Sequence, residues 1–343
     1  MPDPLTELLS RRDWLLADGA TGTTLFAMGL DAGDAPDLWN ADHPERVARL
    51  HAGWVEAGAD LFLTNTFGAN AARLKLHDAQ DRVGELNRLG AEIGREAADR
   101  AARPVVVAGS MGPTGEILEP TGTLSREAAV EIFHEQAEGL KAGGADVLWV
   151  ETISDWQEYA AAGEAARLAG MPWCGTMSFD TAGRTMMGLT SADLARRVAG
   201  MAHGPLAFGA NCGVGASDLL RTILGFAAAG ADRPVIAKGN AGIPKYEHGH
   251  IHYDGTPELM ADYAVMARDA GARIVGGCCG TTPEHLRAMR AALEERPPGP
   301  APTLEGIAAA LGPFSSEADG TGPGTGPGPA AAPDRPRRRR RRS

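Results

Sequence analysis

Short apolar runs alternate with longer amphipathic stretches along the chain. Eight runs have the length of buried strands, at residues 14–19, 60–65, 104–110, 146–152, 173–179, 205–211, 234–240 and 273–278. The stretches between them, such as "PERVARLHAGWVEAG" and "REAAVEIFHEQAEGLKAGG", place apolar residues at helical spacing. Uninterrupted apolar strands that alternate with helices are typical of a parallel sheet that is buried on both faces.

Glycines mark a repeated junction between helix and strand. The phrases "EAGADLFLTNTF", "KAGGADVLWVETI" and "DAGARIVGGCCG" each place a glycine where an amphipathic stretch gives way to an apolar run. Eight such units in about 300 residues fit a (β/α)8 barrel better than an open sheet. The first run also leads into "DGATGTTL", which lacks the G-x-G-x-x-G spacing of a dinucleotide-binding loop. The sequence therefore predicts an α/β protein with a single (β/α)8 TIM-barrel domain over residues 1–312.

The composition changes over residues 313–343. This segment is rich in Gly, Pro and Ala and ends in a run of arginines, which is typical of a disordered tail. It carries seven arginines and three acids, a net charge of +4. Since the whole chain has a net charge of −11, the rest of it carries −15. Such an acidic body is a poor partner for nucleic acid or an anionic membrane. The arginine run is expected to be solvated, although it could bind an acidic partner.

The sequence shows no signal for a membrane or for export. It contains no apolar run of about 18 residues, and its start, "MPDPLTELLSRRDW", lacks the basic and apolar regions of a secretory signal. Four cysteines are too few for a disulfide framework, so we expect a cytoplasmic protein with reduced thiols. The number of subunits is left open, and a homo-oligomer is possible.

The residues at the carboxyl ends of the predicted strands form a consistent set, and in a (β/α)8 barrel these ends carry the chemistry. Three of the four cysteines fall there, although 66 positions separate Cys212 from Cys278, whereas Cys174 lies in mid-strand and is expected in the core. The strand-end residues are Asp18, Gly19, Thr21, Asn65, Thr66, Phe67, Ser110, Met111, Glu151, Asn211, Cys212, Asn240, Cys278 and Cys279.

Three thiols from two strand ends suit a zinc ion that keeps a fourth position open. Neighbouring residues of a regular strand point to opposite faces, so Cys278 and Cys279 can share a metal only if the glycine-rich backbone turns between them. Two alternatives remain. The cysteines could be small buried residues, or Cys278 and Cys279 could form a disulfide that serves thiol-redox chemistry.

A second possible metal site lies in "EHGHIHYD". His248, His250 and His252 stand at alternate positions, so they would share one face of an extended segment. Three histidines can bind zinc, but histidines in loops are more often solvated.

Three thiolates make zinc electron-rich and suited to holding another thiol as a thiolate with a lowered pKa. The implied function is activation of a thiol substrate for attack on an electrophile. Asp18 and Glu151 fit as anchors for a cationic group such as an α-ammonium, or alternatively as acceptors for loop amides.

Six motifs appear in order: "DGATGTTL" (18–25), "TNTFGAN" (64–70), "GSMGPTG" (109–115), "VETISD" (150–155), "GANCGVG" (209–215) and "GGCCGTTPEH" (276–285). On these motifs the chain from about residue 12 to 295 resembles the zinc-dependent homocysteine S-methyltransferases. That family includes betaine–homocysteine methyltransferase, S-methylmethionine-dependent enzymes and the homocysteine-binding module of cobalamin-dependent methionine synthase.

The resemblance implies a TIM barrel that holds one Zn²⁺ per chain on Cys212, Cys278 and Cys279. It also implies an SN2 methyl transfer to the thiolate of homocysteine, which gives methionine.

By the same resemblance, Asp18 and Glu151 would hold the amino group of homocysteine, and the backbone around Gly19 to Thr21 would receive its carboxylate. Asn65, at the end of the second strand, is placed with the substrate-binding residues.

The methyl donor divides the family. Trp39, in "PDLWNADHPERV", resembles the tryptophan of the aromatic cage that binds trimethylammonium in betaine enzymes, but Gly68 and Thr152 stand where the cage tyrosines would be. The donor is therefore expected to be a separate methyl-corrinoid protein or a small betaine-like compound, with S-methylmethionine as the alternative. A non-enzymatic alternative is a zinc-holding or partner-docking module that acts through the arginine tail.

Overall fold

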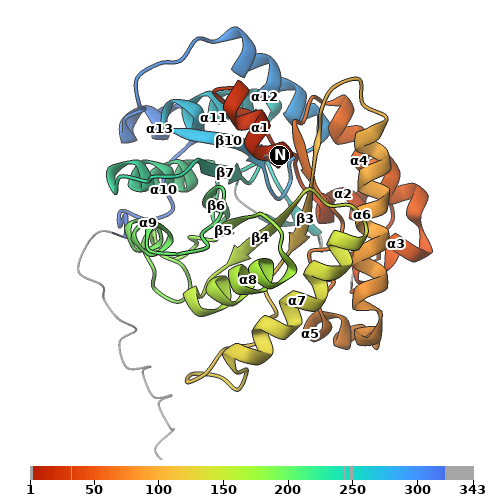
Figure 1. The fold of residues 1–343 in the computed structure, drawn as a ribbon. Coiled ribbons are helices and arrows are strands. Elements are labelled where there is room, and N and C mark those ends of the chain that lie inside the picture. Colours follow the sequence, from red (N-terminus) through yellow and green to blue (C-terminus); the bar gives the residue numbers. More distant parts are fainter. Residues whose placement is uncertain (1–2, 32, 243–244, 248–249, 321–343) are drawn as a thin grey trace, which may run out of the picture.

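Eight parallel strands of the protein form one ring. The computed structural model describes residues 3–31, 33–242, 245–247 and 250–320, without the side chains of residues 245–252 (Figure 1). Eight strands pair in parallel in the order β1-β10-β7-β6-β5-β4-β3-β2. Their bounds are β1 Leu15–Leu16, β2 Leu61–Leu63, β3 Val106–Met111, β4 Val147–Ile153, β5 Trp173–Met177, β6 Phe208–Cys212, β7 Val235–Gly239 and β10 Ala272–Gly277.

The ring closes between β1 and β2. Ala17 forms a parallel bridge with Leu61, and the Asp60 amide donates a 2.7 Å hydrogen bond to the Leu16 carbonyl. The predicted (β/α)8 TIM barrel is confirmed, and every predicted strand overlaps an observed one.

Helices surround this ring on the outside (Figure 1). No helix in the described part of the chain is long and apolar enough to cross a membrane. The bounds are α1 Pro4–Arg11, α2 Thr21–Ala27, α3 Trp39–Asp42, α4 Pro44–Glu56, α5 Ala71–Leu74, α6 Val83–Asp99, α7 Arg126–Ala142, α8 Trp156–Ala169, α9 Ser191–Ala199, α10 Ala216–Ala228, α11 Pro257–Asp269, α12 Pro283–Glu295 and α13 Leu304–Leu311, with short 3₁₀ turns η1 Pro36–Leu38, η2 Lys75–His77 and η3 Gln80–Arg82.

The strands are buried on both faces, which is why they are continuous apolar runs in the sequence. Val107 and Val150 point outward into the core shared with the helices, whereas Val106 and Trp149 point into the barrel interior. Side chains therefore alternate between two cores along each strand.

Helix α1 lies over one end of the barrel (Figure 1). Leu5 and Leu8 belong to the same buried cluster as the inward-facing strand residues. The guanidinium of Arg273, on β10, donates to the carbonyls of Leu9 and Arg12 at 2.9 and 2.8 Å. The helix covers the amino-terminal end of the barrel and leaves the carboxyl end for a site.

The glycines predicted at helix-to-strand junctions have left-handed backbones. Gly58, Gly144 and Gly271 have φ of +101°, +89° and +105°, a region that costs any other residue strain. This confirms the repeated junction and explains why α4, α7 and α11 are each followed so closely by a strand.

The last described residues pack on α10. Arg221 lies over the ring of Phe314, 4.6 Å from its centroid, and the Ser315 amide donates to Asp218 Oδ2 at 2.9 Å. Residues 321–343, which contain the arginine run, lie outside the described residues.

Two further strands, β8 (Lys245–Glu247) and β9 (His250–His252), pair antiparallel after β7. His248 and the side chains of His250 and His252 lie outside the described residues, so a second metal site there stays a hypothesis.

Candidate functional site

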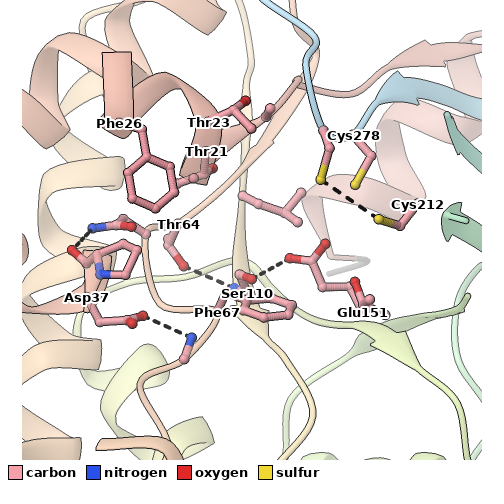
Figure 2. Close-up of a pocket in the computed structure, with 18 of the residues that line it drawn as sticks. Thr21, Thr23, Phe26, Asp37, Thr64, Phe67, Ser110, Glu151, Cys212 and Cys278 are labelled. Carbon is pink, nitrogen blue, oxygen red and sulfur yellow. Dashed lines mark hydrogen bonds between the residues drawn. The ribbon is translucent and has the colours of Figure 1, made fainter. Parts of the chain in front are cut away.

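A cavity of about 570 Å³ lies at the carboxyl ends of the strands. Figure 2 shows Cys212 and Cys278 on one side of it and Phe26 and Asp37 on the other. The predicted strand-end residues that line the cavity are Asp18, Gly19, Thr21, Asn65, Phe67, Ser110, Glu151, Cys212, Cys278 and Cys279. The structure therefore brings most of the predicted strand-end residues to one place.

Three cysteines meet at one edge of this cavity. The Sγ atoms of Cys212, Cys278 and Cys279 all lie within 4.8 Å of one another, and those of Cys212 and Cys279 are 3.8 Å apart. All four cysteines are free thiols. Cys174 is fully buried on β5, as its mid-strand position predicted, and burial raises the pKa of its thiol.

The backbone turns sharply where the cysteines lie. Cys212 has φ +61° and the next residue, Gly213, +73°, while Gly280 has +78° directly after Cys279. A non-glycine residue in the left-handed region is uncommon and strained, and such residues cluster at functional sites. These turns aim side chains from the ends of β6 and β10 at one point.

Asn240, just after β7, joins the two cysteine-bearing loops. Its Oδ1 accepts the Cys279 N–H at 3.1 Å, and its Nδ2 donates to the Gly213 carbonyl at 2.8 Å. Asn211 contacts the third cysteine: its Nδ2 points at the sulfur of Cys278 at 3.7 Å. Asn240 thus holds the backbone of the two cysteine-bearing loops, and Asn211 contacts a cysteine side chain.

The sulfur cluster fits a zinc ion. Tetrahedral Zn–S bonds of about 2.3 Å place neighbouring sulfurs about 3.8 Å apart, which matches the separation of Cys212 and Cys279. Hydrogen bonds from the thiols of Cys212 and Cys278 lower the pKa of Cys279, so this one residue of the three favours the thiolate, the form that ligates metal.

Two predicted acids have different partners in the cavity. Asp18 is fully buried; its Oδ2 accepts the Leu63 N–H at 2.8 Å and its Oδ1 is paired with the ammonium of Lys238. Glu151 accepts a 2.6 Å hydrogen bond from the Ser110 hydroxyl through Oε1 (Figure 2). Burial raises the pKa of Glu151 to about 7, against the opposing effect of Lys238.

Lys238 on β7 is a cavity residue that the sequence analysis missed. The signal was available, because a lysine inside the apolar run "PVIAKGN" is buried only when it has a partner. Burial disfavours its charge, but the carboxylates of Asp18 and Glu151 outweigh that cost and raise the pKa of Lys238 above its ordinary value.

The loop after β1 packs tightly beside the cysteines. A Cβ at Gly19 would lie 2.7 Å from the Thr281 carbonyl oxygen, and the Ala20 N–H donates to that oxygen at 3.1 Å. Only glycine permits this approach. Thr21 then begins α2 at the cavity wall.

Trp39 and Asn65 are placed differently. Trp39 is 7% exposed, packs against His43 and under the Arg46 guanidinium, and is not among the described residues that line the cavity. Asn65 lines the cavity, but its Nδ2 donates to the Pro36 carbonyl at 2.7 Å. The structure therefore gives Trp39 a packing role away from the cavity and Asn65 a bonding role at its wall.

The wall opposite the cysteines is aromatic and acidic. Phe26 and Phe67 line it, and Asp37 fills the space beside Gly68, where an added Cβ would lie 2.8 Å from Asp37 Oδ2. Burial raises the pKa of Asp37 to about 6. Asp37 lies in a 3₁₀ turn rather than at a strand end, so no strand pattern indicated it.

Three comparisons with known proteins agree with this geometry. The family model for homocysteine S-methyltransferase matches residues 15–293. Methionine synthase of Mycobacterium tuberculosis is 31% identical over 335 residues, which cover 92% of this chain and 28% of that protein, and that of Mycobacterium leprae is 31% identical over 318 residues, covering 88% and 26%. The chain thus spans less than a third of the length of these relatives.

Solved structures of the homocysteine methyltransferase MmuM from Escherichia coli match as well. The oxidized form has a TM-score of 0.67 and 28% identity, and the metallated form 0.67 and 27%; each match covers 84% of this chain and 99% of that one. The family model covers most of the chain, from the first strand to the last helices of the barrel. As its motifs predicted, the chain belongs to the homocysteine S-methyltransferase family of enzymes.

Proposed function

We propose that this chain transfers a methyl group to the thiolate of homocysteine and forms methionine, with one Zn²⁺ held by Cys212, Cys278 and Cys279. The observation that carries the proposal is the convergence of three sulfurs within 4.8 Å beside a cavity that also holds Glu151. The kinship with MmuM, which has a metallated form, supports the same assignment.

The zinc, when bound, supplies the positive charge that keeps the substrate sulfur a thiolate near neutral pH. The protein then positions the substrate. Glu151, held by the Ser110 hydroxyl, presents a carboxylate for the α-ammonium, and the tight loop after β1 forms the wall beside it. Fixing the thiolate next to the donor replaces an encounter in solution by a local step.

The methyl transfer itself needs no acid or base. A sulfur lone pair forms the new S–C bond while the bond from the methyl carbon to the donor breaks, and the donor leaves with that electron pair. The cavity is lined largely by apolar groups such as Phe26 and Phe67, and a substrate and donor that fill it would displace water from around the thiolate.

The donor occupies the wall opposite the cysteines. We infer either a methyl-corrinoid protein, which the similarity to methionine synthase supports, or a small betaine-like or sulfonium compound. The second candidate is favoured by Asp37, whose carboxylate would stabilise a cation beside Phe26 and Phe67. A cytoplasmic location, where thiols stay reduced, is part of this proposal.

The test is methionine formation by zinc-loaded protein from homocysteine and each of three donors: betaine, S-methylmethionine, and a methylated corrinoid with its carrier protein. We expect one donor to support turnover and the Cys212→Ala variant to lose it. No methionine with any donor would exclude the proposal. A zinc-poor protein whose thiol count rises by one pair on reduction would instead support the redox alternative for Cys278 and Cys279.

A further inference from the structure

Arg73 is a cation in the part of the cavity wall that also holds Asp37 and Phe67. It lies on α5, directly after the second strand unit of the barrel. Among the described residues, none forms an ion pair or a hydrogen bond with its guanidinium. A guanidinium carries five N–H donors in a planar fork that matches a carboxylate. The side chain therefore offers this wall a binding place for an anionic group.

The chain holds Arg73 at both ends of the residue. Asn70 Oδ1 accepts the Arg73 backbone N–H at 3.0 Å where α5 begins, and the next residue, Leu74, is fully buried. At the other end the guanidinium lies against the loop that follows β3, since an added Cβ at Gly115 would lie 3.2 Å from Arg73 Nη1. A donor group that is already in place loses little conformational freedom when it binds an anion.

A buried acid lies near this guanidinium. Asp37 is 4% exposed, and its Oδ1 accepts the Gly68 N–H at 3.0 Å. Burial raises the pKa of Asp37, and the charge of Arg73 is among the effects that oppose this rise, so the two groups are close enough to interact. In the described part of the chain they nevertheless form no ion pair with each other. This wall thus presents two separate opposite charges beside the rings of Phe26 and Phe67 (Figure 2).

We propose that Arg73 binds a carboxylate on the methyl donor, while Asp37 and the aromatic rings receive the donor's onium group. The wall then selects a small zwitterion, a methylated sulfonium or ammonium that also carries a carboxylate, over an onium compound without a negative charge. This inference rests on the proposed function, and it chooses the small donor over the methyl-corrinoid protein. Arg73 is assigned as a specificity-determining residue.

The course of the methyl transfer places the effect of Arg73 in binding. A sulfur lone pair of the substrate thiolate forms the S–C bond while the bond from the methyl carbon to the onium atom breaks. The donor leaves with that electron pair as a neutral thioether or tertiary amine that keeps its carboxylate. Since the carboxylate does not change during this step, Arg73 stabilises the bound donor and the transition state equally. Such an interaction lowers KM and leaves kcat unchanged.

The main rival role for Arg73 is to offset the buried acids around it. Burial raises the pKa of Glu158, and the charge of Arg73 opposes that rise as well. Two sulfonium donors separate the roles: dimethylsulfonioacetate, and dimethyl(hydroxyethyl)sulfonium, which has a hydroxyl in place of the carboxylate. We would measure kcat and KM for each with homocysteine and zinc-loaded wild type, Arg73→Gln, Arg73→Lys and Lys75→Gln. Lys75 is the matched control, an exposed cation on the same segment that is not among the described residues lining the cavity.

A carboxylate-binding Arg73 predicts a change that depends on the donor. Arg73→Gln should raise KM for dimethylsulfonioacetate about 10- to 100-fold with kcat within about twofold, and should leave KM for the hydroxyl donor and for homocysteine within about twofold. Arg73→Lys keeps the charge without the planar fork, so its KM for dimethylsulfonioacetate should lie between those of wild type and Arg73→Gln. Equal changes in KM for both donors would overturn the proposal, as would the same change in Lys75→Gln.

Binding distinguishes this inference from the proposed function. In calorimetric titrations without homocysteine, wild type should bind dimethylsulfonioacetate at least about tenfold tighter than dimethyl(hydroxyethyl)sulfonium, and Arg73→Gln should remove that difference. This result would support Arg73 even in a protein that forms no methionine. Equal affinity for the two compounds, or no binding of dimethylsulfonioacetate, would overturn the role of Arg73. Turnover with the methyl-corrinoid protein alone would also overturn it and would leave methyl transfer to homocysteine intact.

Discussion

The sulfurs of Cys212 and Cys279 lie 3.8 Å apart, although 67 positions separate the two residues in the chain. They come from β6 and the end of β10, on either side of β7 in the sheet. Asn240, just beyond β7, bonds to both cysteine-bearing loops. The barrel itself therefore creates the site, and the following predictions test its parts.

Zinc content tests the cysteine cluster. Purified wild type should contain about one zinc per chain, and Cys212→Ala or Cys279→Ala should retain little. Cys174→Ala is the matched control, because its thiol lies in the barrel interior and away from the cluster. A wild type prepared without chelator and free of zinc would contradict the assignment, as would equal losses in the control.

Asn240 is expected to position the metal ligands without binding the metal. Asn240→Ala removes the acceptor of the Cys279 amide and the donor to the Gly213 carbonyl, so zinc affinity should fall about 10- to 100-fold in a chelator competition. Asn240→Asp keeps the acceptor and loses only the donor. Its zinc affinity should therefore lie between those of wild type and Asn240→Ala. An unchanged affinity in Asn240→Ala would remove Asn240 from the site.

Glu151 should make ligand binding depend on pH. Its pKa of about 7 means that the carboxylate is mostly neutral below that pH and mostly charged above it. A carboxylate that binds an ammonium is strongest when charged, so methionine affinity should rise about tenfold from pH 6 to pH 8. Calorimetry checks this. Glu151→Gln should bind weakly and without that rise; the same rise in the variant would place the titrating group elsewhere.

His51 should make the fold sensitive to acid. The side chain is fully buried against Phe62, neither ring nitrogen has a hydrogen-bond partner among the described residues, and burial lowers its pKa to about 3. As pH falls, the imidazole is protonated in the unfolded chain near pH 6.5 but in the folded protein only near pH 3. The free energy of unfolding is therefore highest above pH 6.5 and decreases as pH falls toward 3.

Between pH 7 and pH 4.5 the loss from His51 should be about 2–3 kcal/mol. Denaturant unfolding of wild type and His51→Leu at both values gives the comparison. The variant should lose less stability than wild type by that amount, even if it is less stable at pH 7. Parallel losses would show that His51 does not control the acid response.

Two truncations separate the described chain end from the arginine run. Deleting residues 321–343 should leave zinc content, stability and methyl transfer unchanged. Deleting from residue 313 also removes Phe314 and the Ser315 bond to Asp218, and it should lower the free energy of unfolding by about 1–3 kcal/mol. Loss of function with the shorter deletion would favour a module that acts through the arginine tail.

The sequence by itself determined the architecture and the three cysteines that meet at one rim of the barrel. Strands buried on both faces are apolar at every position, so the eight runs could be recognised, and parallel strands in a barrel bring their carboxyl ends to one rim. For that reason Cys212, Cys278 and Cys279 could be placed together from the sequence alone, and in the structure their Sγ atoms lie within 4.8 Å of one another.

The pairing of charges and the walls of the cavity were decided only by the tertiary structure. Lys238 meets Asp18 across 220 positions of the chain, and Asp37 reaches the space beside Gly68 from a short turn. Trp39 has the side chain of a cage residue but packs in the core instead. Strand periodicity fixes which face a residue takes, whereas its partner depends on how separate loops and side chains fill a shared volume.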